Sequence, residues 1–534
     1  MLDILVTNGW LADGTGNPTY PADVAIAGDR IVEVGRLQNA QARRVIDARG
    51  KIVCPGFIDA HSHTDWTILS NPLAQSTIRQ GVTSEVVGNC GSSNAPLNGR
   101  VRATVTERLR GFAYRGAVGW SSYREYLDLL QQMGISCNLA WLVGHNTVRE
   151  AAGVIGPRAT EEQLEEMELL VRQSMEEGVL GLSTGLEFEP GRTAPTAEVI
   201  RLARVVGEYG GIYASHIRNR DAHLQEAIAE FLEIVRRSDT VGEVSHLNVR
   251  HNTGASEGAW ERAVEILARA RQEGWNVLAD TTPFRDGLGQ LAAILPPWLK
   301  AEGPAKAAEL LQDPQVRARL RNDCDRYWRF IHRGEWERVR MMTNPLFPEL
   351  AGMSFVEIAD HWGKDPWDCC FDILAAHGDK MDDLTVIGLL FTEEHVAAMV
   401  SHPLFNLGVD GFSSTTDPEL HMPGAHPIHY AGMVHYLTYH VREKGTLRLE
   451  EAIRKMTSMP ATHFGLRGRG LLAKGCYADV VVFDYDALED VSSVEKPEAY
   501  VRGVEYVLVN GVPVIDGGEH TGARPGRHLL RGAG

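Results

Sequence analysis

The chain has 534 residues, a length that predicts one large barrel with additions or roughly two or three domains. Hydrophobic residues make up 44% of it and charged residues 23%, which is typical of soluble globular proteins. The formal net charge of −17 disfavours a nucleic-acid partner, because phosphates repel an acidic surface. No apolar run reaches the roughly 20 residues that cross a bilayer, so no membrane partner is expected. Seven cysteines, sparse and odd in number, favour a cytoplasmic chain with reduced thiols.

Short strand-like runs flank turn signals at both ends of the chain. Near the N-terminus, the apolar run at 4–6 leads into Asn8-Gly9, a two-residue hairpin signal, and Ala27-Gly28-Asp29 predicts a second turn. Near the C-terminus, residues 477–483 predict a strand and Asn510-Gly511 predicts a hairpin. We therefore expect one small β-sandwich domain that is built from both termini, with two separate β caps as the alternative.

Between the two ends, strand-like runs alternate with amphipathic helical runs. Eight runs predict strands: 57–63, 83–89, 138–144, 178–184, 212–217, 241–247, 276–282 and 405–411. Four runs with apolar residues at helical spacing predict helices: 161–177, 198–209, 222–237 and 259–273. Eight βα units predict an α/β fold of the (β/α)8 TIM-barrel type. A doubly wound open sheet is the competing architecture, but no G-x-G-x-x-G motif follows the first strand.

The expected domain boundaries follow from this alternation. The segment 284–404 separates the seventh strand from the eighth and carries helical runs at 304–311 and 315–321. An insertion of this length is usually functional, and we expect it to form a lid over the C-terminal rim of the barrel. The expected domains are the N-terminal part of the β-sandwich at 1–54, the catalytic barrel at 55–467 and the C-terminal part of the β-sandwich at 468–534.

Potential metal ligands follow five of the eight predicted strands. Two histidines, His61 and His63, stand two residues apart at the end of the first strand, so both rings point to the same face. The other four follow or end the second, fifth, sixth and eighth strands: Cys90, His216, His246 and Asp410. Because barrel active sites lie at the C-terminal ends of the strands, these six side chains are expected around one central volume. Imidazole, thiolate and carboxylate are the usual zinc ligands, so we predict a site for one or two Zn²⁺ ions.

The expected chemistry is hydrolysis of a small-molecule amide. Zinc lowers the pKa of a bound water to about 7, and metal-bound hydroxide is expected to attack the amide carbonyl. Asp410 is placed to bind a metal and to move a proton, first as base for the water and then as acid for the leaving amine. His145, after the third strand, is a candidate substrate contact at the same rim. Four other histidines are expected in loops: His251, His421, His426 and His429.

With these residues assembled, the chain resembles the amidohydrolase superfamily, and within it the N-acyl-D-amino-acid deacylase (D-aminoacylase) group. The stretch 55–63 is similar to the first-strand motif of the superfamily. Further stretches resemble the D-aminoacylase group more specifically: 81–83 with 87–91, 181–186 and 213–218. The resemblance covers nearly the whole length, because residues 478–484 and 509–511 are similar to the small β domain of amidohydrolases.

The resemblance also implies how the ligands divide between two ions. The tight zinc would be held by Cys90, His216 and His246. A second site, weaker or vacant, would be formed by the remaining three residues: His61, His63 and Asp410. Asp410 would also act as the general base and acid.

Two positions depart from the pattern of the group. Where the group has His-Leu-Lys the chain has His246-Leu247-Asn248, and where the group has Pro-Tyr it has Pro283-Phe284. In the family these lysine and tyrosine side chains help to hold the acyl-amino acid, including its carboxylate, so the resemblance implies that substrate anchoring has changed. Three cationic side chains are possible replacements: Arg218, Arg250 and Arg285. The candidate substrate contacts are therefore His145, Arg218, Asn248 and Phe284.

The predicted function is the deacylation of an N-acyl-D-amino acid or related N-acyl compound by a zinc-dependent hydrolase of linear amides. A cyclic amide hydrolase, such as a relative of hydantoinase or dihydroorotase, is the nearest alternative. A deaminase on the same scaffold and a barrel that binds without catalysis are the others.

Overall fold

The computed structural model describes residues 1–37, 39–323, 326–342, 344–420 and 426–532. His421 therefore lies outside the described residues. Of the other histidines expected in loops, His429 lies within helix α15 (Pro427–His435), and His426 is the residue that caps this helix. The loop prediction is wrong for His429, because Pro427 at the first helical position starts a helix there.

A closed parallel barrel forms the centre of the molecule. Its strands are β6 (Phe57–Asp59), β7 (Val82–Val87), β8 (Asn138–Gly144), β9 (Gly181–Gly185), β10 (Ile212–His216), β11 (Val241–Val244), β12 (Val277–Thr281) and β16 (Phe405–Leu407). Each strand pairs with its neighbour in the order β16-β12-β11-β10-β9-β8-β7-β6. The first and last strands meet where the backbone N–H of Ala60 donates to the carbonyl of Leu407 at 3.3 Å. The eight predicted strands and the TIM barrel are confirmed.

Helices surround the barrel because their apolar residues recur on one face. The helices that precede or follow the barrel strands are α1 (Gln75–Arg79), α2 (Val101–Gly111), α3 (Tyr123–Met133), α4 (His145–Ala151), α5 (Glu161–Glu176), α6 (Thr196–Glu208), α7 (Leu224–Ser238), α8 (Ala259–Gln272), α14 (Glu393–Ser401), α15, α16 (Leu449–Lys455) and α17 (Ser458–His463). Helix α7 shows the spacing, since Ile228, Phe231 and Val235 are all buried on the side that meets the core. Helix α5 begins with a capping box between Thr160 and Gln163.

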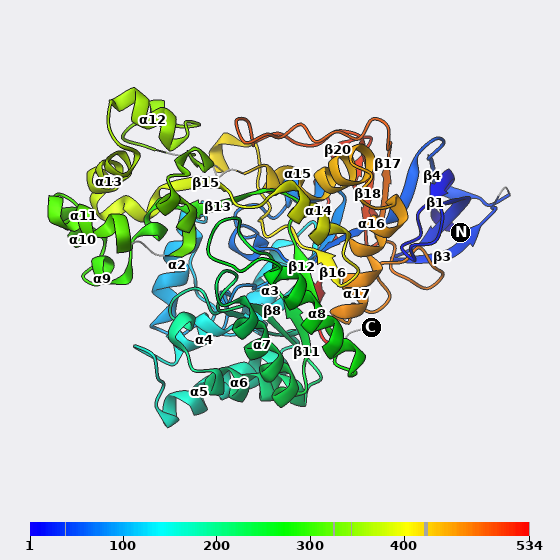
Figure 1. Ribbon diagram of the computed structural model, residues 1–534. Helices are drawn as coiled ribbons and strands as arrows, with labels where there is room; N and C mark the ends of the chain where they lie inside the picture. The colour runs from blue at the N-terminus through cyan, green and yellow to red at the C-terminus, as the bar shows by residue number, and fades with distance from the viewer. Residues whose placement is uncertain (38, 324–325, 343, 421–425, 533–534) are drawn as a thin grey trace.

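The segment between β12 and β16 has secondary structure of its own. It forms an antiparallel sheet in the order β13 (Asp286–Gln290), β15 (Thr385–Leu389), β14 (Val339–Met341). Before α14, which leads into β16, this segment contains the helices α9 (Pro297–Lys300), α10 (Pro304–Leu310), α11 (Pro314–Asp323), α12 (Phe355–Trp362) and α13 (Pro366–His377). Figure 1 shows these helices at the side of the molecule opposite the N-terminal strands. The boundaries of 284–404 and its role as a lid stay predictions.

Strands from both ends of the chain form one mixed sheet. They are β1 (Leu2–Leu11), β2 (Tyr20–Ala27), β3 (Arg30–Gly35), β4 (Ala42–Asp47), β5 (Ile52–Pro55), β17 (Val480–Phe483), β18 (Val504–Val509), β19 (Val512–Asp516) and β20 (Glu519–His520). Strand β17 joins the two ends, because it pairs antiparallel with β5 and places Val481 opposite Cys54. The sheet has a buried core separate from that of the barrel, to which Ile26, Val480 and Leu508 contribute. Two separate caps are thereby excluded, while the exact domain boundaries stay predictions.

Two Asn-Gly pairs behave differently in this sheet. Asn510-Gly511 forms the predicted turn between β18 and β19. Asn8-Gly9 does not form a hairpin, because β1 continues through it to Leu11 with a register shift against β2. Asn8 takes up the extra residue with a left-handed φ of 62°, as in a β-bulge.

None of the helices in the described part of the chain combines the length and the apolar character needed to cross a membrane.

Candidate metal centre

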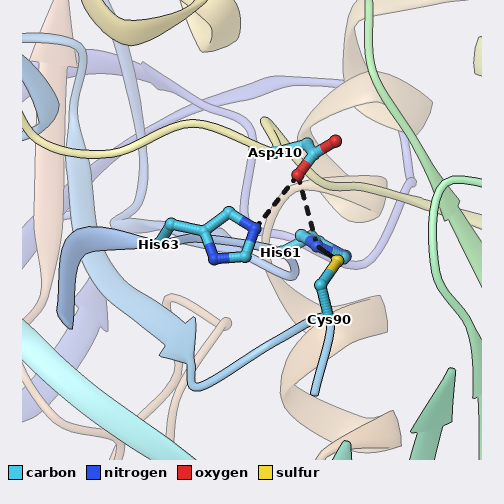
Figure 2. A group of neighbouring side chains, drawn as sticks. All are labelled: His61, His63, Cys90 and Asp410. Atoms are coloured by element: carbon cyan, nitrogen blue, oxygen red, sulfur yellow. Dashed lines mark hydrogen bonds and ion pairs between the residues drawn. The ribbon is translucent and has the colours of Figure 1, made fainter. Parts of the chain in front are cut away.

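The structure brings all six predicted ligands together at the C-terminal end of the barrel. His61 and His63 follow β6, and Cys90 follows β7 by three residues. The other three end or follow later strands: His216 ends β10, His246 follows β11, and Asp410 follows β16. They form two groups that share Cys90, and within each group one ligand atom per residue lies within 4.8 Å of the others. Figure 2 shows the group that contains Asp410.

Cys90 lies at the centre of both groups. Its Sγ is 3.4 Å from Nε2 of His61, 3.4 Å from Nε2 of His246 and 3.7 Å from Nδ1 of His216. Three imidazole nitrogens therefore converge on one sulfur from three different strands. A thiolate in this position can bind an ion in either group or bridge two ions.

Asp410 lies on the open side of the site. Its Oδ1 is 3.2 Å from Nε2 of His63 and 3.4 Å from Nε2 of His61, as the dashed lines in Figure 2 show. Its Oδ2 is 4.0 Å from Nε2 of His246, so the carboxylate faces both groups. The Asp410 side chain is 33% exposed, whereas the His61 side chain is fully buried. Asp410 is therefore accessible to a substrate from the barrel mouth.

The backbone at three of the ligands is strained. Cys90, His246 and Asp410 have φ values of 52°, 35° and 54°, in the left-handed region. Such a conformation costs about 1–3 kcal/mol at a residue other than glycine and persists where a functional site requires it. Glycine is required nearby for a different reason, because a Cβ on Gly88 would lie 2.1 Å from the carbonyl oxygen of Leu142.

The side chains of the site shift one another's pKa values. Burial raises the pKa of the Cys90 thiol, but the neighbouring His61 and His246 outweigh this effect and hold that pKa well below its usual range. Burial also raises the pKa of Asp410, and the same two histidines bring it below its ordinary value. Burial lowers the pKa of His63, but its contact with Asp410 and the charge of Cys90 raise it to about 9. Cys90 and Asp410 are thus anionic while His63 is protonated at neutral pH, and a divalent cation that binds here would release the histidine protons.

Two buried carboxylates orient the histidines from behind, and sequence reasoning missed both. Oδ2 of Asp280 is 3.2 Å from Nδ1 of His61, while its Oδ1 accepts the backbone N–H of His246 at 2.7 Å. Oε2 of Glu187 is 2.8 Å from Nε2 of His216. These contacts leave Nε2 of His61 and Nδ1 of His216 to face the sulfur, as in carboxylate–histidine–metal triads. Asp280 had a signal in the sequence, because it lies in the seventh strand near the same rim.

The donor set fits zinc. Buried imidazoles, one thiolate of low pKa and one carboxylate are the ligand types that zinc prefers. The ligand atoms are close enough to share one ion in each group. Cys90, His216 and His246 would hold one ion, and the group of His61, His63, Cys90 and Asp410 would hold the other.

The four candidate substrate contacts lie in different surroundings. His145 is fully buried, and its Nε2 is 2.9 Å from Glu198. The Arg218 guanidinium pairs with Glu230 at 2.8 Å. The ring of Phe284 stacks on a histidine, His435, with centroids 4.1 Å apart. Asn248 is buried, and its Oδ1 accepts from Arg220 at 3.4 Å, which places it beside His246.

Comparison with known proteins places the chain in one family. The model of the Amidohydrolase family matches residues 44–320 and 397–515. Full-length relatives include an N-acyl-D-glutamate deacylase of Alcaligenes xylosoxydans xylosoxydans, which is 34% identical over 100% of this chain and 97% of its own length. The chain belongs to the amidohydrolase family.

Solved structures of relatives match this chain over nearly its whole length. A D-aminoacylase solved to define the role of its binuclear metal center has a TM-score of 0.80 at 29% identity, with 99% of this chain and 100% of that chain covered. An N-acyl-D-glutamate deacylase from Bordetella bronchiseptica, in complex with zinc and a phosphonate inhibitor, has a TM-score of 0.79 at 31% identity and covers 99% of each chain. The D-aminoacylase resemblance and the expectation of zinc are confirmed by these matches.

Proposed function

We propose that this protein is a zinc-dependent amidohydrolase that removes the acyl group from an N-acyl-D-amino acid. The observation that carries the proposal is the position of Cys90, whose sulfur is shared by two groups of ligands with Asp410 on their open side. The phosphonate in the Bordetella bronchiseptica relative mimics the tetrahedral intermediate of an amide hydrolysis, which supports the same reaction class.

When bound, zinc supplies a Lewis acid and lowers the pKa of a coordinated water. Proton transfer is the role of Asp410. Its low pKa keeps the carboxylate ionised at neutral pH, so it can accept a proton from water at the mouth of the site. His63 and His61, each within 3.4 Å, hold the carboxylate in place. As the C–N bond breaks, the proton on Asp410 passes to the leaving nitrogen, which departs as a neutral amine.

The insertion between β12 and β16 is proposed to contribute to specificity. The two segments matched by the family model leave out residues 321–396, which fall inside this insertion. The family model thus spans the barrel and leaves out much of the insertion, whereas the N-acyl-D-glutamate deacylase and D-aminoacylase relatives are matched over 99–100% of this chain. An insertion of its length at the rim of a barrel commonly contacts substrate.

A substrate panel tests the proposal. Zinc-loaded protein is incubated with N-acetyl, N-formyl and N-carbamoyl derivatives of D- and L-amino acids, with hydantoins, and with amino-heterocycles. We expect release of free D-amino acids from the linear N-acyl compounds. Ring opening of hydantoins alone would favour a cyclic amide hydrolase, and ammonia release alone would favour a deaminase. Zinc-loaded protein that turns over none of these compounds would contradict the proposal.

A further inference from the structure

A buried guanidinium beside the metal centre has no part in the chemistry described above. Arg220 follows His216 by four residues and is 6% exposed. Its Nη1 is 2.9 Å from Nδ1 of His246 and 3.4 Å from Oδ1 of Asn248. Its Nη2 is 3.3 Å from Oε2 of Glu187. A cation therefore lies directly behind a ligand histidine, at the depth of the centre.

The charge of Arg220 is poorly neutralised by the protein. The only carboxylate oxygen that it contacts among the described residues is Oε2 of Glu187, and that oxygen also accepts from His216 at 2.8 Å and from Arg250 at 2.7 Å. Arg250 has a second carboxylate at 3.0 Å, that of Asp221. Nε of Arg220 is buried without a hydrogen-bond partner in the described part of the chain. A buried charge is costly unless an anion and further hydrogen bonds compensate it.

Metal binding removes one more of its contacts. Nε2 of His246 faces Cys90, and the lone pair of this nitrogen is what an ion would bind. A neutral imidazole that binds a metal through Nε2 carries its hydrogen on Nδ1. Nδ1 and the guanidinium are then both donors, so the 2.9 Å contact between them can no longer be a hydrogen bond. Nη1 then keeps two longer contacts of 3.4 Å, to the backbone carbonyl of His246 and to Oδ1 of Asn248, so Arg220 can take a stronger acceptor.

We propose that Arg220 binds the α-carboxylate of the substrate. The inference rests on the proposed function and narrows its substrate class to N-acyl amino acids with a free carboxylate. A planar guanidinium with an unpaired Nε offers the paired donors that a carboxylate accepts. The 2.9 Å contact with Nδ1 of His246 places Arg220 next to a ligand of the centre. In an N-acyl amino acid one carbon separates the amide nitrogen from the carboxylate, so the two groups can reach neighbouring positions. Asn248, which Arg220 also contacts, offers an amide group to the same anion.

The test compares an N-acetyl-D-amino acid with its carboxamide in wild-type protein, Arg220→Met and Arg220→Lys. In Arg220→Met we expect KM for the acid to rise by about 10- to 100-fold, the usual worth of a charge-assisted hydrogen bond. KM for the carboxamide is expected to stay within about threefold, so the preference for the acid is lost. For Arg220→Lys, KM for the acid is expected to lie between the values of wild-type protein and Arg220→Met. Zinc content by mass spectrometry and binding of the free D-amino acid product by calorimetry give readouts that do not depend on turnover.

Arg250→Met is the matched control, because Arg250 is also buried and contacts the same Glu187. We expect it to lower the melting temperature and the zinc affinity without changing the ratio between acid and carboxamide. Equal losses on acid and carboxamide in Arg220→Met, or loss of its zinc, would overturn the proposal, because Arg220 would then only position His246. The proposal would also be overturned if Arg250→Met, and not Arg220→Met, lost activity on the acid alone. Wild-type protein that hydrolyses neither compound would refute the proposed function itself, and the role of Arg220 with it.

Discussion

Oε2 of Glu187 lies 2.8 Å from Nε2 of His216, and the opposite nitrogen of that ring lies 3.7 Å from Sγ of Cys90. One carboxylate thus fixes which nitrogen of His216 faces the metal centre. The same oxygen holds Arg250 at 2.7 Å, so the orientation of the ligand and the neutrality of the buried arginines depend on one side chain.

Replacement of this carboxylate is expected to weaken metal binding. In Glu187→Gln the neutral amide can still accept from His216, but it no longer raises the basicity of the ring. We expect zinc affinity to fall by about 10- to 100-fold, measured by competition with a chelator. The melting temperature should also fall, because Arg220 loses its carboxylate partner and Arg250 keeps only that of Asp221. Glu208→Gln, which removes an exposed pair with Arg172, is the control and should match wild type. Unchanged zinc affinity in Glu187→Gln would contradict this role.

The sulfur of Cys90 is expected to be needed for the binding of both ions. Removal of zinc by a chelator should abolish activity, and added zinc should restore it. Cys90→Ser should lower the zinc content of both groups together, because each group includes Cys90. Elemental analysis of the purified protein measures this content. Cys476→Ser, in the turn region before β17, should retain full zinc. A Cys90→Ser variant with the wild-type zinc content would show that the histidines and Asp410 suffice.

The carboxylate of Asp410 is expected to be needed for catalysis, while one of the two metal groups should bind zinc without it. In Asp410→Asn the proton acceptor is lost, and kcat should fall by about 10²- to 10⁴-fold. The group of Cys90, His216 and His246 is intact in this variant, so it should still contain zinc. Rate assays and elemental analysis of the same sample separate the two effects. Turnover near the wild-type rate in this variant would rule out Asp410 as the proton carrier.

A buried lysine is expected to make stability depend on pH. Lys455 in α16 is buried, its ammonium donates to the carbonyl of His402, and burial lowers its pKa from 10.5 to about 7. Below pH 7 Lys455 is charged in both the folded and the unfolded state, and the free-energy cost of burying its charge is at its maximum. As pH rises from 7 towards 10.5 only the unfolded state is charged, so the penalty shrinks and stability increases.

Lys455→Met should therefore raise the melting temperature more at pH 6 than at pH 10, as measured by differential scanning fluorimetry. Lys474→Met, at an exposed position, should show no such difference between the two pH values. An equal change at both pH values in Lys455→Met would mean that packing, and not charge, sets the effect.

Much of this protein could be predicted from local sequence. The eight barrel strands are short apolar runs between amphipathic helices, and such periodicity depends on neighbours in the chain. The positions of His61, Cys90 and Asp410 at strand ends followed from the same pattern, because parallel strands in a barrel end at one rim. The sequence therefore determined the barrel and the residues that gather at its centre.

Other features were decided only by tertiary structure, because they join residues far apart in the chain. Asp280 reaches His61 across 219 positions, and nothing local marks either residue as the other's partner. The left-handed backbone at Cys90, His246 and Asp410 is likewise held by packing at the rim and not by residue type.

The two Asn-Gly pairs show the same division between local and tertiary information. One dipeptide became a hairpin at Asn510 and a bulge at Asn8, because the strand beside each pair, and not the pair itself, decided where the chain could turn.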